Sequence, residues 1–317
     1  MKIALAGQGA FGIRHLEALA KIPDVEVISL AGGRPASTEE VAKKWRIPHW
    51  TTDLAESLKQ PGLDAVILAS PTQIHAKQAE MCMRAGKHVL IEIPIADSLA
   101  DSERILQVQK ETGVVAMAGH VRRFNPSHQW VHRKIEAGEL AIQQMDVQTY
   151  FFRRTNTNAK GEPRSWTDHL LWHHACHTVD LFAYQTGEQP SIAHAVQGPL
   201  HPELKIAMDM SIQLKVPSGA ILTLSLSFNN NGPLGSFFRY ICDNGTYKAV
   251  YDDLIDGYDK PIDVSQIDVS TNGIELEDRE FFAAIKAGRE PNSSVLQTID
   301  AMRTLDRLER CLESPHA

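Results

Sequence analysis

The chain has 317 residues, more than a single domain usually holds, so we expect two domains that each bury a hydrophobic core. Its net charge of −7 excludes a general affinity for nucleic acids or acidic membranes, because such proteins need a positive field. Hydrophobic residues make up 43% of the sequence, but no apolar run is long enough to cross a bilayer, so we expect a soluble protein.

The first 120 residues predict alternating strands and helices. A short apolar strand at 2–6 runs into a glycine-rich turn, and a helix with an apolar face follows the turn. Further strands are expected at 25–30, 65–70, 87–92 and 114–118, with helices at 38–44 and 98–112. This alternation predicts a doubly wound parallel sheet.

The glycine-rich turn has the pattern GxGxxG between a strand and a helix, and its candidate cofactor-binding residues are Gly7, Gly9, Ala10, Phe11 and Gly12. Gly7 permits the tight turn, Gly9 lets the backbone approach a pyrophosphate, and Gly12 allows close helix packing. The motif alone is a weak signal, but its place in a strand–turn–helix unit strengthens it. We therefore expect residues 1–120 to form a Rossmann domain that binds a dinucleotide.

The end of the second expected strand favours NADP over NAD. An NAD-selective site usually places a carboxylate here, but residues 30–35 read LAGGRP. Arg34 can pair with a 2′-phosphate, and Ser37 and Thr38 can add hydroxyl donors. NADP is the expected cofactor and NAD a weaker one. The alternative is that Arg34 is a solvated surface residue.

Past Gly119 the pattern changes to longer alternating strands, expected at 144–153, 207–216, 220–228 and 237–243. Such strands suit an antiparallel sheet with one covered face. A helix is expected at 167–184, and helical periodicity returns from about residue 275. Residues 121–317 are therefore expected to form an α+β domain with an open, mostly antiparallel sheet and C-terminal helices.

The helix expected at 167–184 carries a polar stripe, because positions 173, 177, 180 and 184 share one helical face. The stripe consists of His173, His177, Asp180 and Tyr184. The opposite side is apolar and should pack into the core through Leu171, Ala175, Val179 and Phe182. Histidine suits general acid–base chemistry near neutral pH. Two structural histidines are the alternative reading. Zinc is less favoured, because no HExxH motif or cysteine pair accompanies them.

The cysteines predict a reducing environment. The four of them lie far apart without a CxxC pair, so neither a disulfide framework nor a cysteine-rich metal site is indicated. No secretory signal is visible before the glycine-rich turn. We expect a cytoplasmic protein without a metal.

Four segments resemble the Gfo/Idh/MocA oxidoreductases, whose signature is PTxxH followed by AGKHVxxEKP. They read SPTQIH at 70–75, AGKHVLIEIP at 85–94, RRFNP at 122–126 and AIKAGREP at 284–291. The resemblance implies an NAD(P)-binding Rossmann domain, followed by an open sheet that carries the substrate site and the contacts of a homodimer. It adds these candidates beside the cofactor: Ser70, Pro71, Thr72, His75, Glu92, Ile93 and Pro94.

Two positions depart from the family pattern. Ile93 stands where the EKP lysine usually bonds a substrate hydroxyl, and His173 replaces the first aspartate of DxGxHxxD. His177 keeps the position of the family's catalytic histidine. An ordinary sugar or inositol dehydrogenase is therefore less favoured.

A narrower resemblance involves residues 146–154, 160–174 and 231–245. These segments are similar to family members that oxidise the cyclic hemiacetal of 4-carboxy-2-hydroxymuconate-6-semialdehyde to 2-pyrone-4,6-dicarboxylate with NADP, in the protocatechuate 4,5-cleavage pathway of aromatic-degrading bacteria. Two alternatives stay open: a related NAD(P) oxidoreductase acting on another carboxylated alcohol or sugar acid, and a non-catalytic dinucleotide sensor.

Oxidation of a hemiacetal requires a base, and we expect His177 to fill this role while His173 orients the hydroxyl or relays the proton. A small dicarboxylate substrate also requires basic groups, since arginine suits carboxylate recognition. The expected substrate-binding residues are Arg122, Arg123, Arg153, Arg164 and Asp180. Further basic candidates are Arg154, Lys160 and Arg239.

Overall fold

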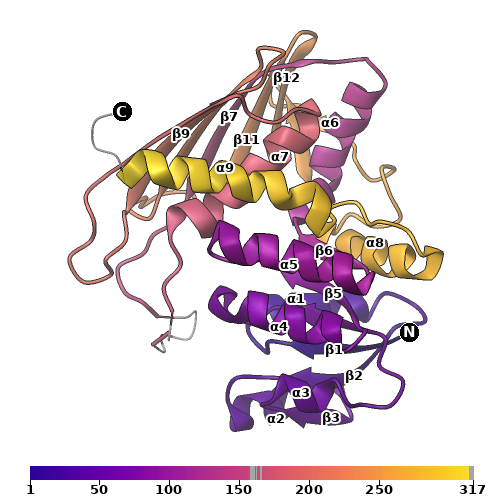
Figure 1. Ribbon diagram of the computed structural model, residues 1–317. Coiled ribbons are helices and arrows are strands. Elements are labelled where there is room, and N and C mark those ends of the chain that lie inside the picture. The colour runs from indigo at the N-terminus through magenta and orange to yellow at the C-terminus, as the bar shows by residue number, and fades with distance from the viewer. Residues whose placement is uncertain (158–160, 162, 165, 314–317) are drawn as a thin grey trace. The chain divides into compact units, whose positions relative to one another are not determined.

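The computed structural model describes residues 1–157, 161, 163–164 and 166–313, and this part of the chain forms two compact units (Figure 1). The first unit contains residues 1–121 and 272–299, and the second contains residues 122–271 and those from 300 onward. The chain first leaves the first unit next to the expected domain boundary at residue 120. Segment 272–299 then returns to the first unit. The first unit therefore consists of two separate segments of the chain, and one boundary at residue 120 does not describe it.

The described part of the first unit has a six-stranded parallel sheet in the order β3-β2-β1-β4-β5-β6. The strand bounds are Lys2–Ala6 (β1), Glu26–Ala31 (β2), His49–Thr51 (β3), Ala65–Leu68 (β4), His88–Glu92 (β5) and Ala116–Gly119 (β6). The apolar side chains of β1 and β4 are fully buried or nearly so, as a sheet covered on both faces requires. The strand order reverses between β1 and β4, and open α/β sheets bind ligands at this position.

Short helices connect these strands, and one more returns from the far end of the chain. Their bounds are Ala10–Leu19 (α1), Pro35–Trp45 (α2), Leu54–Ser57 (α3), Thr72–Ile74 (η1), His75–Arg84 (α4), Leu99–Thr112 (α5) and Gly273–Ala287 (α8). Helix α8 packs against α1. Its N-terminus is capped by Asn272, whose Oδ1 accepts hydrogen bonds from Ile274 N and Glu275 N.

In the described residues of the second unit, eight strands form a sheet in the order β14-β13-β12-β11-β7-β10-β9-β8. Their bounds are Ile142–Tyr150 (β7), Ile192–Gln197 (β8), Asp209–Lys215 (β9), Ile221–Ser227 (β10), Gly235–Cys242 (β11), Gly245–Val250 (β12), Asp253–Asp256 (β13) and Pro261–Ile262 (β14). Strands β7 and β10 pair in parallel, and the other neighbouring strands pair antiparallel. Strand β9 alternates exposed and buried residues, so one face of this sheet is covered and the other is open.

Helices cover the buried face of this sheet. They are α6 (Pro126–Glu136), the π-helical segment η3 (Leu170–Ala175) and α7 (Cys176–Thr186), which pack on its strands. Helix α9 (Val295–Glu313) also reaches η3, because Trp172 Nε1 donates to Glu309 Oε1 at 2.8 Å.

The expected architecture is confirmed: a doubly wound parallel sheet is followed by an open, mostly antiparallel sheet. The helix expected to begin at 167 begins at 170, and its first turn is a π-helix. Strands β3, β8, β12, β13 and β14 were not expected. None of the described helices combines the length and the apolar character needed to span a bilayer.

Candidate active site

The glycine turn lies at the carboxyl end of β1, where the strand order reverses. Gly7 has φ +116°, and a Cβ there would lie 2.2 Å from the carbonyl oxygen of Ala69. A Cβ on Gly12 would lie 1.9 Å from the carbonyl oxygen of Gly7, whereas one on Gly9 would meet no atom within 4 Å. Only glycine fits at the first and third positions of the motif. The residues present therefore fit the pyrophosphate of a dinucleotide at the N-terminus of α1.

Gln8 connects this turn to residues 33–37, the segment expected to bind the ribose of the cofactor. Its Nε2 donates to Ser37 Oγ at 3.0 Å, and its Oε1 accepts from Gly33 N at 3.1 Å. Arg34 is the N-cap residue of α2, and its carbonyl accepts from the hydroxyls of Ser37 at 3.2 Å and Thr38 at 2.7 Å. Thr38 is fully buried, so its hydroxyl supports the turn from inside. The sequence did not indicate this role of Gln8, because the GxGxxG motif accepts any residue at its second position.

His75 joins the two segments expected beside the nicotinamide. Its Nε2 lies 2.8 Å from the carbonyl oxygen of Ser70, and its Nδ1 lies 3.0 Å from that of Pro94, which follows a cis peptide bond. Burial lowers the pKa of His75, although the two carbonyl contacts counteract part of this shift. Thr72 is buried in η1, between Ser70 and His75 along the chain. These expected cofactor residues are thus held together by one buried imidazole.

Glu92 ends β5 with its carboxylate turned into the protein. Its Oε1 lies 2.8 Å from His15 Nε2, and its Oε2 accepts a hydrogen bond from Ile93 N at 3.3 Å. A Cβ on Gly119 would lie 3.2 Å from the Cα of Glu92, so the neighbouring strand needs a glycine here. Because the Glu92 carboxylate has partners within the unit, a cofactor contact here would involve the backbone or Ile93.

In the second unit, the two candidate histidines lie in different kinds of helix. His173 belongs to the π-helical segment η3, and His177 to the regular helix α7. A π-helical turn is wider than an α-helical turn, so the shared face derived from α-helical spacing does not hold exactly between them. The apolar side is confirmed, since its residues are at most 2% exposed: Leu171, Ala175, Val179 and Phe182.

Aromatic contacts position His173. Its ring stacks on Trp166 with a centroid distance of 5.5 Å and an interplanar angle of 20°. Its Nδ1 accepts a hydrogen bond from His169 N at 3.3 Å, at the start of the same segment. His177 is half-buried one helical turn further on, in α7. Both histidines therefore lie at the junction of η3 and α7.

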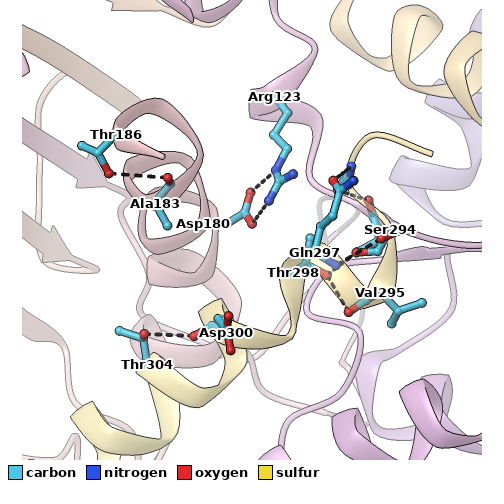
Figure 2. Close-up of polar contacts among 12 residues, drawn as sticks. Arg123, Asp180, Ala183, Thr186, Ser294, Val295, Gln297, Thr298, Asp300 and Thr304 are labelled. Carbon is cyan, nitrogen blue, oxygen red and sulfur yellow. Dashed lines mark hydrogen bonds and ion pairs between the residues drawn. The ribbon is translucent and has the colours of Figure 1, made fainter. Parts of the chain in front are cut away.

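Arg123 and Asp180 bind each other. The guanidinium donates from Nε at 2.8 Å and from Nη2 at 2.7 Å to the two carboxylate oxygens (Figure 2). The side chains are 5% and 2% exposed, and the guanidinium also lies over the ring of Tyr184 at 4.6 Å. Both residues were expected to bind substrate. The two charges bind each other, and the expected contact of these residues with substrate stays a prediction.

Asp168, which sequence reasoning missed, brings three basic residues together. Its Oδ2 lies 2.8 Å from Arg153 Nη2 and 3.1 Å from His174 Nε2, and its Oδ1 lies 3.0 Å from Arg164 Nη1. Burial would raise the pKa of Asp168, but the hydrogen bond and charge of His174, with both arginines, outweigh burial and lower it. The i, i+4 spacing of Arg164 and Asp168 was the feature of the sequence that could have indicated this ion pair. Lys160 lies outside the described residues.

Arg122 has a different environment from the other expected arginines. Its guanidinium lies 5.0 Å from the ring centroid of Tyr251 and 5.6 Å from that of Phe238. Its Nη1 donates to Asn125 Oδ1 at 3.4 Å. Two aromatic faces orient the planar cation, as cation–π geometry favours.

Comparison with known proteins agrees with this arrangement. A family model described as "Oxidoreductase family, NAD-binding Rossmann fold" matches residues 1–120, and one described as "Bacterial oxidoreductases, C-terminal" matches residues 126–268. The 4-carboxy-2-hydroxymuconate-6-semialdehyde dehydrogenase of Sphingobium sp. (strain NBRC 103272 / SYK-6) is 66% identical over 313 residues, which cover 99% of each chain. The chain belongs to the Gfo/Idh/MocA oxidoreductase family.

Two further similar proteins are more distant. The scyllo-inositol 2-dehydrogenase (NAD(+)) of Bacillus subtilis (strain 168) is 33% identical over 141 residues, which cover 44% of this chain and 41% of that protein. A levoglucosan dehydrogenase solved in complex with NADH superposes with a TM-score of 0.86 at 20% identity and covers 99% of this chain and 97% of that chain. The family membership and the oxidoreductase class predicted from the sequence are thus confirmed.

Proposed function

We propose that this Gfo/Idh/MocA protein oxidises the cyclic hemiacetal of 4-carboxy-2-hydroxymuconate-6-semialdehyde to 2-pyrone-4,6-dicarboxylate. The observation that carries the proposal is the 66% identity, along almost the whole chain, to a dehydrogenase named for this semialdehyde. The lack of an activated cysteine fits the proposal, because a substrate that cyclises by itself needs no cysteine nucleophile. Cys176 is fully buried, which agrees with a packing role.

His177 is the proposed general base. A bound NADP supplies the hydride acceptor. His177 takes the proton of the hemiacetal hydroxyl. The carbon that bears this hydroxyl loses its hydrogen as hydride, and its bond to the hydroxyl oxygen becomes the carbonyl of the lactone. General base catalysis contributes roughly 10²- to 10⁴-fold in rate. His173, stacked on Trp166, is proposed to orient the hydroxyl or to relay the proton.

NADP is the proposed cofactor because of the residues after β2. Segment 30–35 offers no carboxylate for a ribose 2′-hydroxyl, and Arg34 begins α2 at this place. The hydrogen bonds from Gln8, Ser37 and Thr38 hold the Arg34 turn in one conformation. An ordered turn lets a guanidinium meet a phosphate at a low entropic cost. NAD is proposed as the weaker cofactor.

The substrate's carboxylates are proposed to bind at Arg122, Arg153 and Arg164. Arg153 and Arg164 share the single carboxylate of Asp168, so this cluster keeps an excess of positive charge. Arg122 is oriented by two aromatic rings. Bidentate arginine contacts suit planar carboxylates such as those of a pyrone dicarboxylate.

We further propose a cytoplasmic homodimer that contacts its partner through the open sheet of the second unit. All four cysteines lie among the described residues, and no disulfide joins them, which suits a reducing compartment. The uncovered face of β9 and β10 supports the dimer proposal, since open faces of this kind are candidates for association.

The decisive experiment mixes purified protein, NADP and freshly generated semialdehyde, and follows NADPH absorbance and the pyrone product. Wild type should turn over, and His177→Ala should lose about 10²-fold or more in kcat, because the base is removed. The exposed His194 on β8 offers the matched control, so His194→Ala should retain activity.

Three outcomes decide among the hypotheses. Turnover lost only in His177→Ala supports both the substrate and the base. Turnover only with another carboxylated alcohol or sugar acid would replace the substrate. A folded protein that binds NADP and oxidises none of these compounds would indicate a sensor.

A further inference from the structure

A buried histidine connects α1, α8 and the end of β5 in the first unit. His15 is fully buried, and its Nδ1 lies 2.9 Å and 3.2 Å from the two carboxylate oxygens of Asp278 on α8. Its Nε2 lies 2.8 Å from Glu92 Oε1. Asp278 is fully buried, and Glu92 nearly so. We name these three residues, His15, Glu92 and Asp278, the His15 clasp.

The clasp fits an imidazolium ion. Each ring nitrogen faces a carboxylate, so a ring that carries two protons donates a hydrogen bond to both partners. Burial would lower the pKa of His15, but the charge and hydrogen bonds of Asp278 and Glu92 outweigh burial and raise the pKa well above 6.5. The titratable groups that face the ring are Glu92 from β5 and Glu277 and Asp278 from α8.

Glu277 lies beside the clasp without taking part in its hydrogen bonds. It is fully buried, and neither carboxyl oxygen has a hydrogen-bond partner among the residues that the structure describes. Burial raises the pKa of Glu277 well above its usual range, and the nearby Glu92 adds to the shift. An ionised carboxylate without a partner would be too costly to bury, so Glu277 is a neutral acid near pH 7.

A metal ion is the competing interpretation of this cluster. His15, Glu92 and Glu277 bring donor atoms within 4.8 Å of one another. The hydrogen-bonded contacts of both His15 nitrogens with carboxylates favour the imidazolium, which supplies the positive charge that a cation would otherwise bring. The charge state of Glu277 separates the two interpretations, because a metal ligand must be ionised.

The clasp holds the segment that follows β5. The Glu92 carboxylate that binds His15 through Oε1 also accepts a hydrogen bond from Ile93 N through Oε2. Two residues later the carbonyl oxygen of Pro94 contacts His75. The turn from Glu92 to Pro94 is therefore fixed at both ends by buried imidazole rings, and through His15 it is tied to α8.

We propose that His15 is a positioning residue, which clamps Glu92 to Asp278 and thereby fixes the turn 92–94 in the orientation that receives the nicotinamide half of the cofactor. This inference rests on the proposed cofactor site at Glu92–Pro94. It does not depend on the identity of the oxidised substrate, because it concerns cofactor binding. A loss of the clasp should affect the nicotinamide half and spare the adenosine half.

The test compares two ligands on the full-length protein, NADP and 2′,5′-ADP, which lacks the nicotinamide. His15→Gln and Asp278→Asn should weaken NADP binding roughly tenfold, since a hydrogen bond to a charged group is lost, and should leave 2′,5′-ADP binding unchanged. Glu277→Gln is the matched control, because it replaces a neutral, equally buried group next to Asp278. Affinities are measured by fluorescence titration at a temperature where circular dichroism shows each variant folded.

A pH series adds a signature that a purely structural histidine would not give. The folded-state pKa of His15 is raised, so the clasp is intact below about pH 6.5 and is lost as the pH rises through the raised value. NADP affinity relative to 2′,5′-ADP should therefore fall at alkaline pH in wild type, and this fall should be absent in His15→Gln.

Several results would overturn the inference. They are an equal loss of both ligands in the clasp variants, unchanged NADP binding in them, a loss of NADP binding in Glu277→Gln, or a stoichiometric divalent metal in the purified protein. If wild type prefers NAD, NAD and ADP-ribose replace the two probes and the same comparison applies. Failure of the proposed function is recognised separately, as NADP binding by wild type without oxidation of the semialdehyde.

Discussion

Arg34 is the residue that we propose to select NADP over NAD. Replacing it by alanine removes a charge-assisted contact with a 2′-phosphate, so KM for NADP should rise roughly 10- to 100-fold. KM for NAD should stay close to the wild-type value. Steady-state kinetics with both cofactors measure the difference. Lys44→Ala, at an exposed position of the same helix, is the control. Equal increases for NADP and NAD would show that the 2′-phosphate is recognised elsewhere.

Single residues also show what a sequence reveals and what it hides. Gly7 and Gly12 could be assigned because the backbone leaves no room for a Cβ, and the motif records that restriction. The pairing of Arg123 with Asp180 could not be predicted, because 57 residues separate them along the chain and nothing in one sequence marks them as partners. A charged residue in a suggestive segment can serve a ligand or a neighbour, and only the fold distinguishes these roles.

At the scale of elements, the pair of Arg123 and Asp180 connects segment η2 (Val121–Arg123) to helix α7. Asp180→Asn leaves the Arg123 cation buried with a neutral partner, so the free energy of unfolding should fall by about 3–5 kcal/mol. Urea denaturation measures this change. In the exposed pair of Lys43 and Glu39, the control Glu39→Gln should cost at most about 1 kcal/mol. A similar small effect for Asp180→Asn would contradict a structural role for the buried pair.

The elements that sequence patterns predicted are those with strong periodicity. Strands β1, β4 and β5 are apolar runs, and β9 and β10 alternate strictly. Strand β3 has three residues and β14 has two, too few to show any period. The π-helical segment η3 could not be predicted either, since one wider turn leaves no mark in the spacing of apolar residues.

At the scale of the whole molecule, the open sheet predicts the assembly state. Light scattering of wild type should give the mass of a dimer if this face associates. Ile221→Glu places a charge on the uncovered face of β10, where Ile221 is 38% exposed, and should shift the protein to monomers. Val269→Glu, on an exposed residue outside the strands, is the control. A dimer that persists in Ile221→Glu would indicate a different interface.

The return of segment 272–299 to the first unit also has a consequence for protein synthesis. The ribosome makes β1 to β6 first, but α8, which packs on α1 and carries Asp278, follows only after every strand of the larger sheet. The unit that begins first is therefore completed only after residues 122–271 have been made. Throughout translation of residues 122–271, the nascent chain presents the α8-binding face of α1 uncovered, together with a His15 that has no Asp278 to bind.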